Sequence, residues 1–297
     1  MQKPRGYWLR LFGVGLGFFY ILFVVAYAWI TADMMISPSH HPICCDTPAN
    51  FGAEFETVTL LTKDGLKLYG WYIPSTNGTA VILLHGYGGD RTSTLAYAKM
   101  LNSHGYGVLL YDQRASGESE GETRSWGWLD VWDVESAIGY LKSRNDVNPK
   151  GIGIMGCSTG AEIAIGAGAQ FQDIQVVIAD GAHYTTASDS WPPYEFKDWV
   201  GWPVYPFLIT FMELKSGASA PLSLREAASL ITPRHLMLIV AGENGYEQVR
   251  AQSYYDEASE PKEYWVVEGA SHCGGHLARP EEYEERIISF FDEPLLK

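Results

Sequence analysis

Positively charged side chains are scarce in this sequence. Its 297 residues include 21 Lys and Arg against 35 Asp and Glu, which gives a formal net charge of -14. The first 32 residues contain three cations, Lys3, Arg5 and Arg10, and no acidic residue, so the remainder is more acidic than the chain as a whole. A domain of this charge repels the phosphates of nucleic acids and anionic lipid surfaces. We therefore expect no nucleic-acid partner.

Cysteine is also rare, and no internal repeat or low-complexity tract is present. Cys44 and Cys45 are adjacent, whereas Cys157 and Cys273 each stand beside a candidate catalytic residue. No Cys-x-x-Cys motif or histidine pair has the spacing of a metal site, so the sequence predicts neither a metal nor another cofactor. A disulfide between Cys157 and Cys273 is conceivable in an oxidising compartment, but the sequence leaves the pairing open.

One stretch, from Leu11 to Ala32, lacks charged side chains altogether and is long enough to cross a bilayer. A cleaved signal peptide is the alternative, because Ala26-Tyr27-Ala28 offers a small-x-small cleavage pattern. The apolar run exceeds that of a typical signal peptide, and bulky Trp29 would follow the cut. We therefore predict that residues 1–32 form a membrane anchor. The positive-inside rule places residues 33 onward outside the cytoplasm.

The rest of the chain divides into a tether and one folded domain. Residues 33–53 are rich in proline, histidine and small polar residues, which is typical of a tether, and the domain is predicted at 54–297. Residues 56–62 and 66–73 predict a hairpin around Asp64-Gly65. Short apolar runs then alternate with helical patterns, which predicts a mostly parallel sheet covered on both faces. The later predicted strands are 80–84, 107–111, 152–155, 175–179, 235–241 and 263–267, and predicted helices include 131–141 and 280–291.

The pentapeptide Gly156-Cys157-Ser158-Thr159-Gly160 follows one of these strands and precedes a helix start rich in small residues. A G-x-S-x-G sequence suits a sharp turn that exposes the serine at the carboxyl edge of a sheet, where the helix N-terminus faces it. The pentapeptide alone arises by chance in roughly one chain of this length in ten, and the serine could instead only cap the helix. Its sequence context makes Ser158 the candidate nucleophile.

Three other segments follow predicted strands: His85 to Gly89, Asp112 to Ser119, and Gly269 to His272. With the Ser158 pentapeptide, they make the chain from about Glu54 onward resemble the α/β-hydrolase superfamily, in its branch of membrane-anchored bacterial esterases and serine-aminopeptidase-like hydrolases. The resemblance implies an α/β-hydrolase fold with a sheet of about eight strands. The sequence departs from the family at Ala115-Ser116, where Gly-His is usual, and after Ala241, where the expected Asp is missing.

The resemblance also implies roles for residues around the serine. His272 is the predicted base, and His276 is the alternative. The backbone N–H groups of Tyr87 and Thr159 are the predicted oxyanion hole, which holds the negative charge that develops on a carbonyl oxygen. A glycine-rich turn without a ligand is the alternative for the segment that contains Tyr87.

The catalytic acid is the least defined part of the predicted site. A histidine base needs a partner on its second nitrogen to fix its tautomer and stabilise its charged form. Gly245 occupies the position where the family usually has the acid. Glu247 is our first candidate, and Glu243 and Asp180 are the alternatives.

Residues 181–232 are an insertion where a simple α/β unit needs one helix, and in this superfamily such an insertion usually forms a cap. Its aromatic side chains favour an apolar pocket for an acyl or leaving group, although a small satellite core is equally compatible with them. The aromatic residues concerned are Tyr184, Trp191, Tyr194, Phe196, Trp199, Trp202, Tyr205, Phe207 and Phe211.

These patterns together predict a serine hydrolase that forms an acyl-enzyme with a small-molecule or lipid-like carboxylic ester. A peptidase or amidase of the same fold is the first alternative, because leaving-group protonation is all that separates the two activities in sequence. A catalytically inactive fold that serves as a binding module is the second alternative. The sequence defines neither the acyl group nor the oligomeric state.

Overall fold

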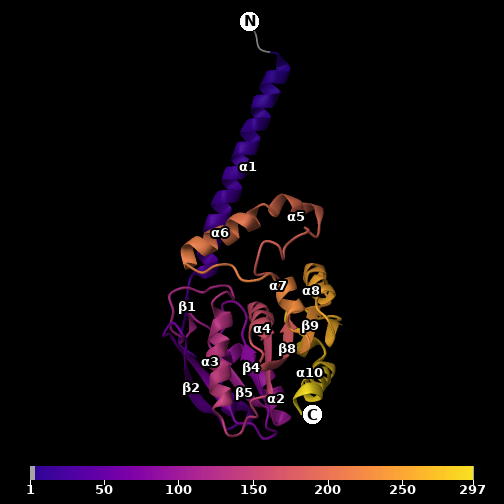
Figure 1. Ribbon diagram of the computed structural model, residues 1–297. Coiled ribbons are helices and arrows are strands. Elements are labelled where there is room, and N and C mark those ends of the chain that lie inside the picture. Colours follow the sequence, from indigo (N-terminus) through magenta and orange to yellow (C-terminus); the bar gives the residue numbers. More distant parts are fainter. Residues whose placement is uncertain (1–3, 297) are drawn as a thin grey trace.

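A long helix projects from an α/β domain in the computed structural model of the protein, which describes residues 4–296 (Figure 1). Lys3 lies outside the described residues. The helices are α1 (Arg5–Ile36), α2 (Leu95–Ser103), α3 (Asp130–Lys142), α4 (Thr159–Gln170), α5 (Phe196–Gly201), α6 (Val204–Ser216), α7 (Leu224–Ser229), α8 (Gly245–Glu257), α9 (Gly275–Ala278) and α10 (Pro280–Leu295), with two short 3-10 helices, η1 (Pro48–Phe51) and η2 (Arg91–Thr94). The strands are β1 (Ser39–His40), β2 (Glu56–Leu61), β3 (Lys67–Ile73), β4 (Ala80–Leu84), β5 (Gly107–Tyr111), β6 (Ser116–Gly117), β7 (Ile152–Cys157), β8 (Ile174–Asp180), β9 (His235–Ala241) and β10 (Lys262–Val267).

The central sheet has eight strands in the order β2-β3-β5-β4-β7-β8-β9-β10. The hairpin of β2 and β3 is antiparallel, β3 is antiparallel to β5, and the remaining pairs are parallel. Every residue of β4 and β5 is buried, because helices cover both faces of the sheet. Such strands have continuous apolar sequences, which is why they could be located from the sequence. The prediction of a mostly parallel sheet of about eight strands is confirmed.

Two hydrophobic cores flank the sheet. Helices α3, α4, α7 and α8 pack on one face, while α2 and α10 pack on the other. The residues that a helix turns toward a sheet recur every three or four positions, and in α10 they include Tyr283, Ile287 and Phe291, all buried. This arrangement leaves the carboxyl ends of the parallel strands free to carry the loops of a site.

Residues 33–53 do not form the tether that their composition suggested. Helix α1 continues to Ile36, and β1 pairs with β6. The backbone N–H of Ser39 donates to the carbonyl of Ala115 over 2.8 Å, and Ile43 and Phe51 pack against the core on the α2 side. The prediction that the folded domain begins near residue 54 is therefore wrong, because these backbone and apolar contacts fix the preceding segment to the domain.

The insertion at 181–232 contains α5, α6 and α7 and lies over one end of the sheet (Figure 1). Leu208, Ile209 and Met212 of α6 form a third core with Ala28 and Ala32 of α1, separate from the two cores on the sheet. The predicted satellite core therefore exists. One of its walls is the N-terminal helix itself.

Candidate active site

Ser158 lies at the turn between β7 and α4 with φ +55° and ψ -123°. This backbone conformation is unfavourable for any residue other than glycine. It persists because the surrounding structure imposes it on Ser158. A Cβ on Gly156 would lie 2.0 Å from the carbonyl oxygen of Gly160, and a Cβ on Gly160 would lie 2.4 Å from that of Leu84. Both outer glycines of the pentapeptide are thus required by close backbone packing, as a tight strand-to-helix turn demands.

The segment after β4 is held beside this turn by His85. The Nε2 atom of His85 accepts from the backbone N–H of Gln113 over 3.0 Å, and the Gln113 side chain donates to the His85 carbonyl over 2.6 Å. Tyr87 and Thr159 line a common cavity of about 20 Å³, enough for a water molecule. Within residues 4–296, neither of their backbone N–H groups has an acceptor. Two free donors thus border one small cavity.

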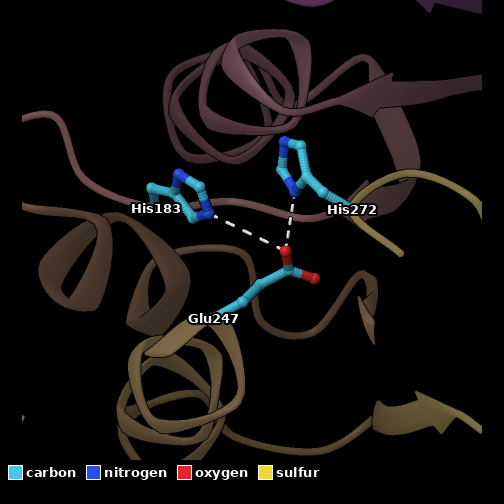
Figure 2. A group of neighbouring side chains, drawn as sticks. All are labelled: His183, Glu247 and His272. Atoms are coloured by element: carbon cyan, nitrogen blue, oxygen red, sulfur yellow. Dashed lines mark hydrogen bonds and ion pairs between the residues drawn. The ribbon is translucent and has the colours of Figure 1, made fainter. Parts of the chain in front are cut away.

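His272 follows β10, and its Nδ1 atom lies 2.7 Å from Oε2 of Glu247 (Figure 2). Glu247 is in the first turn of α8, which begins just after β9. The Asn244 side chain caps this helix by accepting from the backbone N–H of Glu247 over 3.2 Å. The backbone N–H of Ala241 donates to Oε1 of Glu247 over 2.6 Å. The carboxylate is therefore fixed by both of its oxygens.

The surroundings favour the charged forms of both groups. Burial would raise the pKa of Glu247, but the imidazoles of His183 and His272 and the N–H of Ala241 outweigh it and lower the pKa to about 2. The hydrogen bond to Glu247 raises the pKa of His272 above its usual 6.5, against the opposing effect of burial. Glu247 is thus an anion at neutral pH, placed where it stabilises a positively charged His272.

The alternative residues lie in other surroundings. Glu243 is exposed. Asp180 is buried and accepts from the Tyr283 hydroxyl over 2.7 Å, and desolvation raises its pKa to about 7. His276 packs against the rings of Tyr97 and Tyr283. Among the described residues, Glu247 is the carboxylate that contacts His272.

A disulfide joins Cys157 to Cys273, with their Cα atoms 6.0 Å apart. It therefore links the residue before Ser158 to the residue after His272. The ring of His272 also lies against Gly181, where a Cβ would be 2.8 Å from its Cε1 atom, and the Ser158 N–H donates to the neighbouring Asp180 carbonyl over 2.8 Å. The structure thus brings the turn at Ser158 and the loop of His272 together. Cys44 and Cys45 form a second disulfide.

His183 is a further residue of the site that the sequence analysis missed. Its ring stacks on that of His272, with centroids 4.8 Å apart, and its Nε2 atom lies 3.7 Å from Oε2 of Glu247 (Figure 2). Its backbone N–H donates to Glu162 over 3.1 Å. A single histidine in a loop carries no periodic signal, and only its position three residues after β8 could have pointed to it.

His183, Glu247 and His272 also present three atoms that could ligate a metal ion, all within 4.8 Å of one another. The 2.7 Å separation of His272 Nδ1 and Glu247 Oε2 is that of a hydrogen bond. A metal ion between them would have to replace this hydrogen bond. The present geometry therefore fits an acid–base pair better than a metal site.

The cap and α1 enclose a larger cavity of about 300 Å³, whose lining includes Tyr184 and Tyr246, the residues that follow His183 and precede Glu247. Three of the nine predicted cap aromatics line it, namely Tyr184, Trp202 and Tyr205. The aromatic insertion thus contributes both to a satellite core and to a cavity with aromatic walls, which Lys197 and Asp198 also line.

Comparison with known proteins gives the family of this chain. Residues 76–221 match the family described as serine aminopeptidase, S33. An uncharacterized protein of Mycobacterium tuberculosis is 30% identical over 80% of this chain and 79% of its own length. The chain belongs to this family of α/β hydrolases. An uncharacterized protein of Salmonella typhimurium is 32% identical over 50% of this chain, and the match spans about half of that relative, 52% of its length.

A solved esterase of Pyrococcus furiosus has a similar fold, with a TM-score of 0.72 and 25% identity over 88% of this chain and 98% of that one. The α/β-hydrolase fold and the predicted family are thereby confirmed. The structure shows what surrounds the two departures from the family pattern. Ala115 has φ +54°, a conformation that favours the usual glycine. Glu247 reaches His272 from the first helical turn after β9, although no Asp stands at the strand end.

Proposed function

We propose that this hydrolase cleaves carboxylic esters through an acyl-enzyme on Ser158. The observation that carries the proposal is the 2.7 Å contact between Glu247 and His272, beside a strained serine turn. Ser158 Oγ attacks the carbonyl carbon, and His272 takes the hydroxyl proton. His272 then returns that proton to the alcohol that leaves. Water repeats the same steps on the acyl-enzyme and releases the carboxylic acid.

Each remaining part of the site has a role in this reaction. The N–H groups of Tyr87 and Thr159 donate to the oxyanion of each tetrahedral intermediate. Glu247 holds the tautomer of His272 that leaves its Nε2 atom free to accept, and it stabilises the imidazolium. Likeness to a Pyrococcus furiosus esterase supports an ester over an amide as the substrate. Comparing matched ester and anilide substrates tests this preference.

Labelling by a fluorophosphonate tests the nucleophile whatever the natural substrate. We expect Ser158→Ala to abolish labelling and hydrolysis of p-nitrophenyl butyrate. The melting temperature should not change, because alanine is smaller than serine and can adopt the same backbone conformation. Ser143→Ala changes an exposed serine and is the matched control. Near-normal turnover of Ser158→Ala would show that the nucleophile is misassigned, and an unlabelled wild-type chain would favour an inactive binding module.

We also propose that α1 anchors the hydrolase with its domain outside the cytoplasm. It is long and apolar enough to cross a membrane, and Arg5 and Arg10 lie in its first two turns, before the charge-free run. Packing of Ala28 and Ala32 against α6 favours retention of the helix over cleavage after Ala28. Protease added to spheroplasts should digest the domain. Full protection, or a mature chain that begins at Trp29, would contradict this topology.

A further inference from the structure

The cap of this hydrolase packs along its N-terminal helix. Val24, Ala28 and Ala32 form a buried stripe on α1, one helical turn apart, in a helix whose other apolar side chains are mostly exposed. The last two share a core with Leu208 and Met212 of α6. The stripe is confined to the C-terminal half of α1, so the cap covers that half and leaves the N-terminal half bare (Figure 1).

Three contacts show how far the cap extends along α1. Lys215 of α6 pairs with Asp33 over 2.8 Å, and Phe211 packs on Trp29 with ring centroids 5.2 Å apart. At the far end, the Tyr20 hydroxyl donates to the carbonyl of Val200 in α5. The stretch from Tyr20 to Asp33 is about 20 Å long. Because the charge-free run ends at Ala32, α5 and the start of α6 lie beside residues that we place in the bilayer.

The part of the cap nearest the bare half of α1 is apolar and exposed. Phe196, Trp199 and Val200 of α5, here called the α5 patch, are 87%, 52% and 58% exposed. Soluble proteins seldom expose apolar side chains together in this way. Lys197 and Glu195 form an exposed ion pair beside the patch. Because Val200 contacts Tyr20, near the middle of the charge-free run, an embedded α1 would put this patch at the depth of the acyl chains, where the two charges are tolerated as a pair.

The cap cavity lies between α1, the cap and the segments that carry His183 and Glu247. Its walls include Tyr27 and Thr31 of α1, Trp202 of the cap, and Tyr246, the residue before Glu247. The proposed anchor therefore forms one side of the cavity, and Tyr184 and Tyr246, the sequence neighbours of His183 and Glu247, form another.

We propose that the α5 patch lies in the adjacent lipid leaflet and that the cap cavity receives the acyl chain of a bilayer-resident ester through the side that faces α1. The acidic domain repels anionic lipid headgroups, so the substrate is a neutral or zwitterionic acyl lipid. The assignment of this lipid as a substrate rests on the proposed ester hydrolysis. The position of α5 in the leaflet rests on the packing against α1.

Photo-cross-linking tests the position of α5 without reference to catalysis. The full chain carrying Ser158→Ala is placed in phosphatidylcholine nanodiscs that contain a diazirine-bearing phosphatidylcholine. After illumination, labelled peptides are identified by mass spectrometry. We expect cross-links in α1 and in residues 194–207. Cross-links confined to α1 would overturn the placement of α5 in the leaflet.

A substrate comparison tests the route into the cavity. The variant Phe196→Asp/Val200→Asp changes two exposed side chains that do not line the cavity, and Leu61→Asp on β2, an exposed residue of the central sheet, is the control. We measure hydrolysis of p-nitrophenyl palmitate in nanodiscs and of water-soluble p-nitrophenyl acetate. The ratio of the palmitate rate to the acetate rate should fall at least tenfold in the α5 variant and stay unchanged in the control.

The two proposals fail in different ways. An unchanged ratio in the α5 variant would overturn entry from the bilayer, even if both esters are cleaved. A wild-type chain that cleaves neither ester would overturn the proposed ester hydrolysis and the lipid substrate with it. The cross-linking result would still decide where α5 lies.

Discussion

Replacing Glu247 by glutamine should inactivate the hydrolase while leaving its fold intact. The backbone N–H of Ala241 lies 2.6 Å from Oε1, and it can only donate, so it selects the amide oxygen of the glutamine for that position. The amide NH2 group then takes the place of Oε2, 2.7 Å from His272 Nδ1. A donor there forces Nδ1 to accept and moves the proton to Nε2, which can no longer take the proton of Ser158.

The size of the effect follows from the electrostatics of the pair. The pKa of Glu247 falls from 4.5 to about 2, which corresponds to about 3 kcal/mol favouring its charged form. The side chain of Glu247 is fully buried, so solvent screens little of this interaction. Because His183 and the Ala241 N–H contribute to the same shift, about 3 kcal/mol, or about 10²-fold in rate, is the upper bound of the electrostatic loss. The added loss of the correct tautomer brings the expected decrease in kcat to about 10⁴-fold, as in a serine protease triad.

Steady-state hydrolysis of p-nitrophenyl butyrate measures this loss, and thermal melting checks the fold. We expect kcat to fall and KM to change little, because the amide is isosteric and does not touch the substrate. Glu243→Gln and Asp180→Asn are the matched controls and should retain activity, since Glu243 is exposed and Asp180 bonds Tyr283. Wild-type turnover in Glu247→Gln would refute the assignment, as would an equal loss in Asp180→Asn.

Three other predictions concern pH, stability and selectivity. Glu247 raises the pKa of His272, which must be neutral to act as a base, so the acid limb of kcat/KM should have its midpoint above pH 6.5 and move down in Glu247→Gln. Burial raises the pKa of Glu162 to about 8. The folded protein therefore binds this proton more tightly than the unfolded chain does, and the free energy of unfolding falls as pH rises from about 4.5 to 8. Glu162→Gln should therefore melt higher than wild type at pH 9 but not at pH 4; equal differences at both values would contradict this. Trp202→Ala should change selectivity among acyl chain lengths by about 1 to 3 kcal/mol per methylene, whereas equal loss on every chain length with a lower melting temperature would indicate a role in packing alone.

The sheet and the serine turn could be predicted because their sequences are dictated by local geometry. A strand buried on both faces must be apolar throughout, and both Gly156 and Gly160 are required by backbone contacts under 3 Å. The order of the motifs then located the site at the carboxyl ends of the strands. These features depend on residues close together in the sequence.

Other features depend on contacts between distant parts of the chain and could not be decided from the sequence. Residues 33–53 have the composition of a tether, but the pairing of β1 with β6 depends on a loop that lies far along the chain. The sequence could only rank Glu247 above Glu243 and Asp180, because the reach of its side chain depends on how Asn244 starts α8. His183 had no sequence signal, and its stacking on His272 results from tertiary structure.

The disulfide between Cys157 and Cys273 makes the covalent structure of the candidate site depend on the redox conditions in which the chain folds. The two cysteines are separated by 116 positions, and closing a loop of about that size restricts the unfolded chain by about 4 to 5 kcal/mol in the entropic description. Before oxidation, packing and non-covalent contacts such as the Ser158 N–H bond to the Asp180 carbonyl hold the serine turn and the histidine loop in register. In an oxidising compartment this bond can form and complete the covalent assembly of the site, whereas in a reducing compartment the site lacks it.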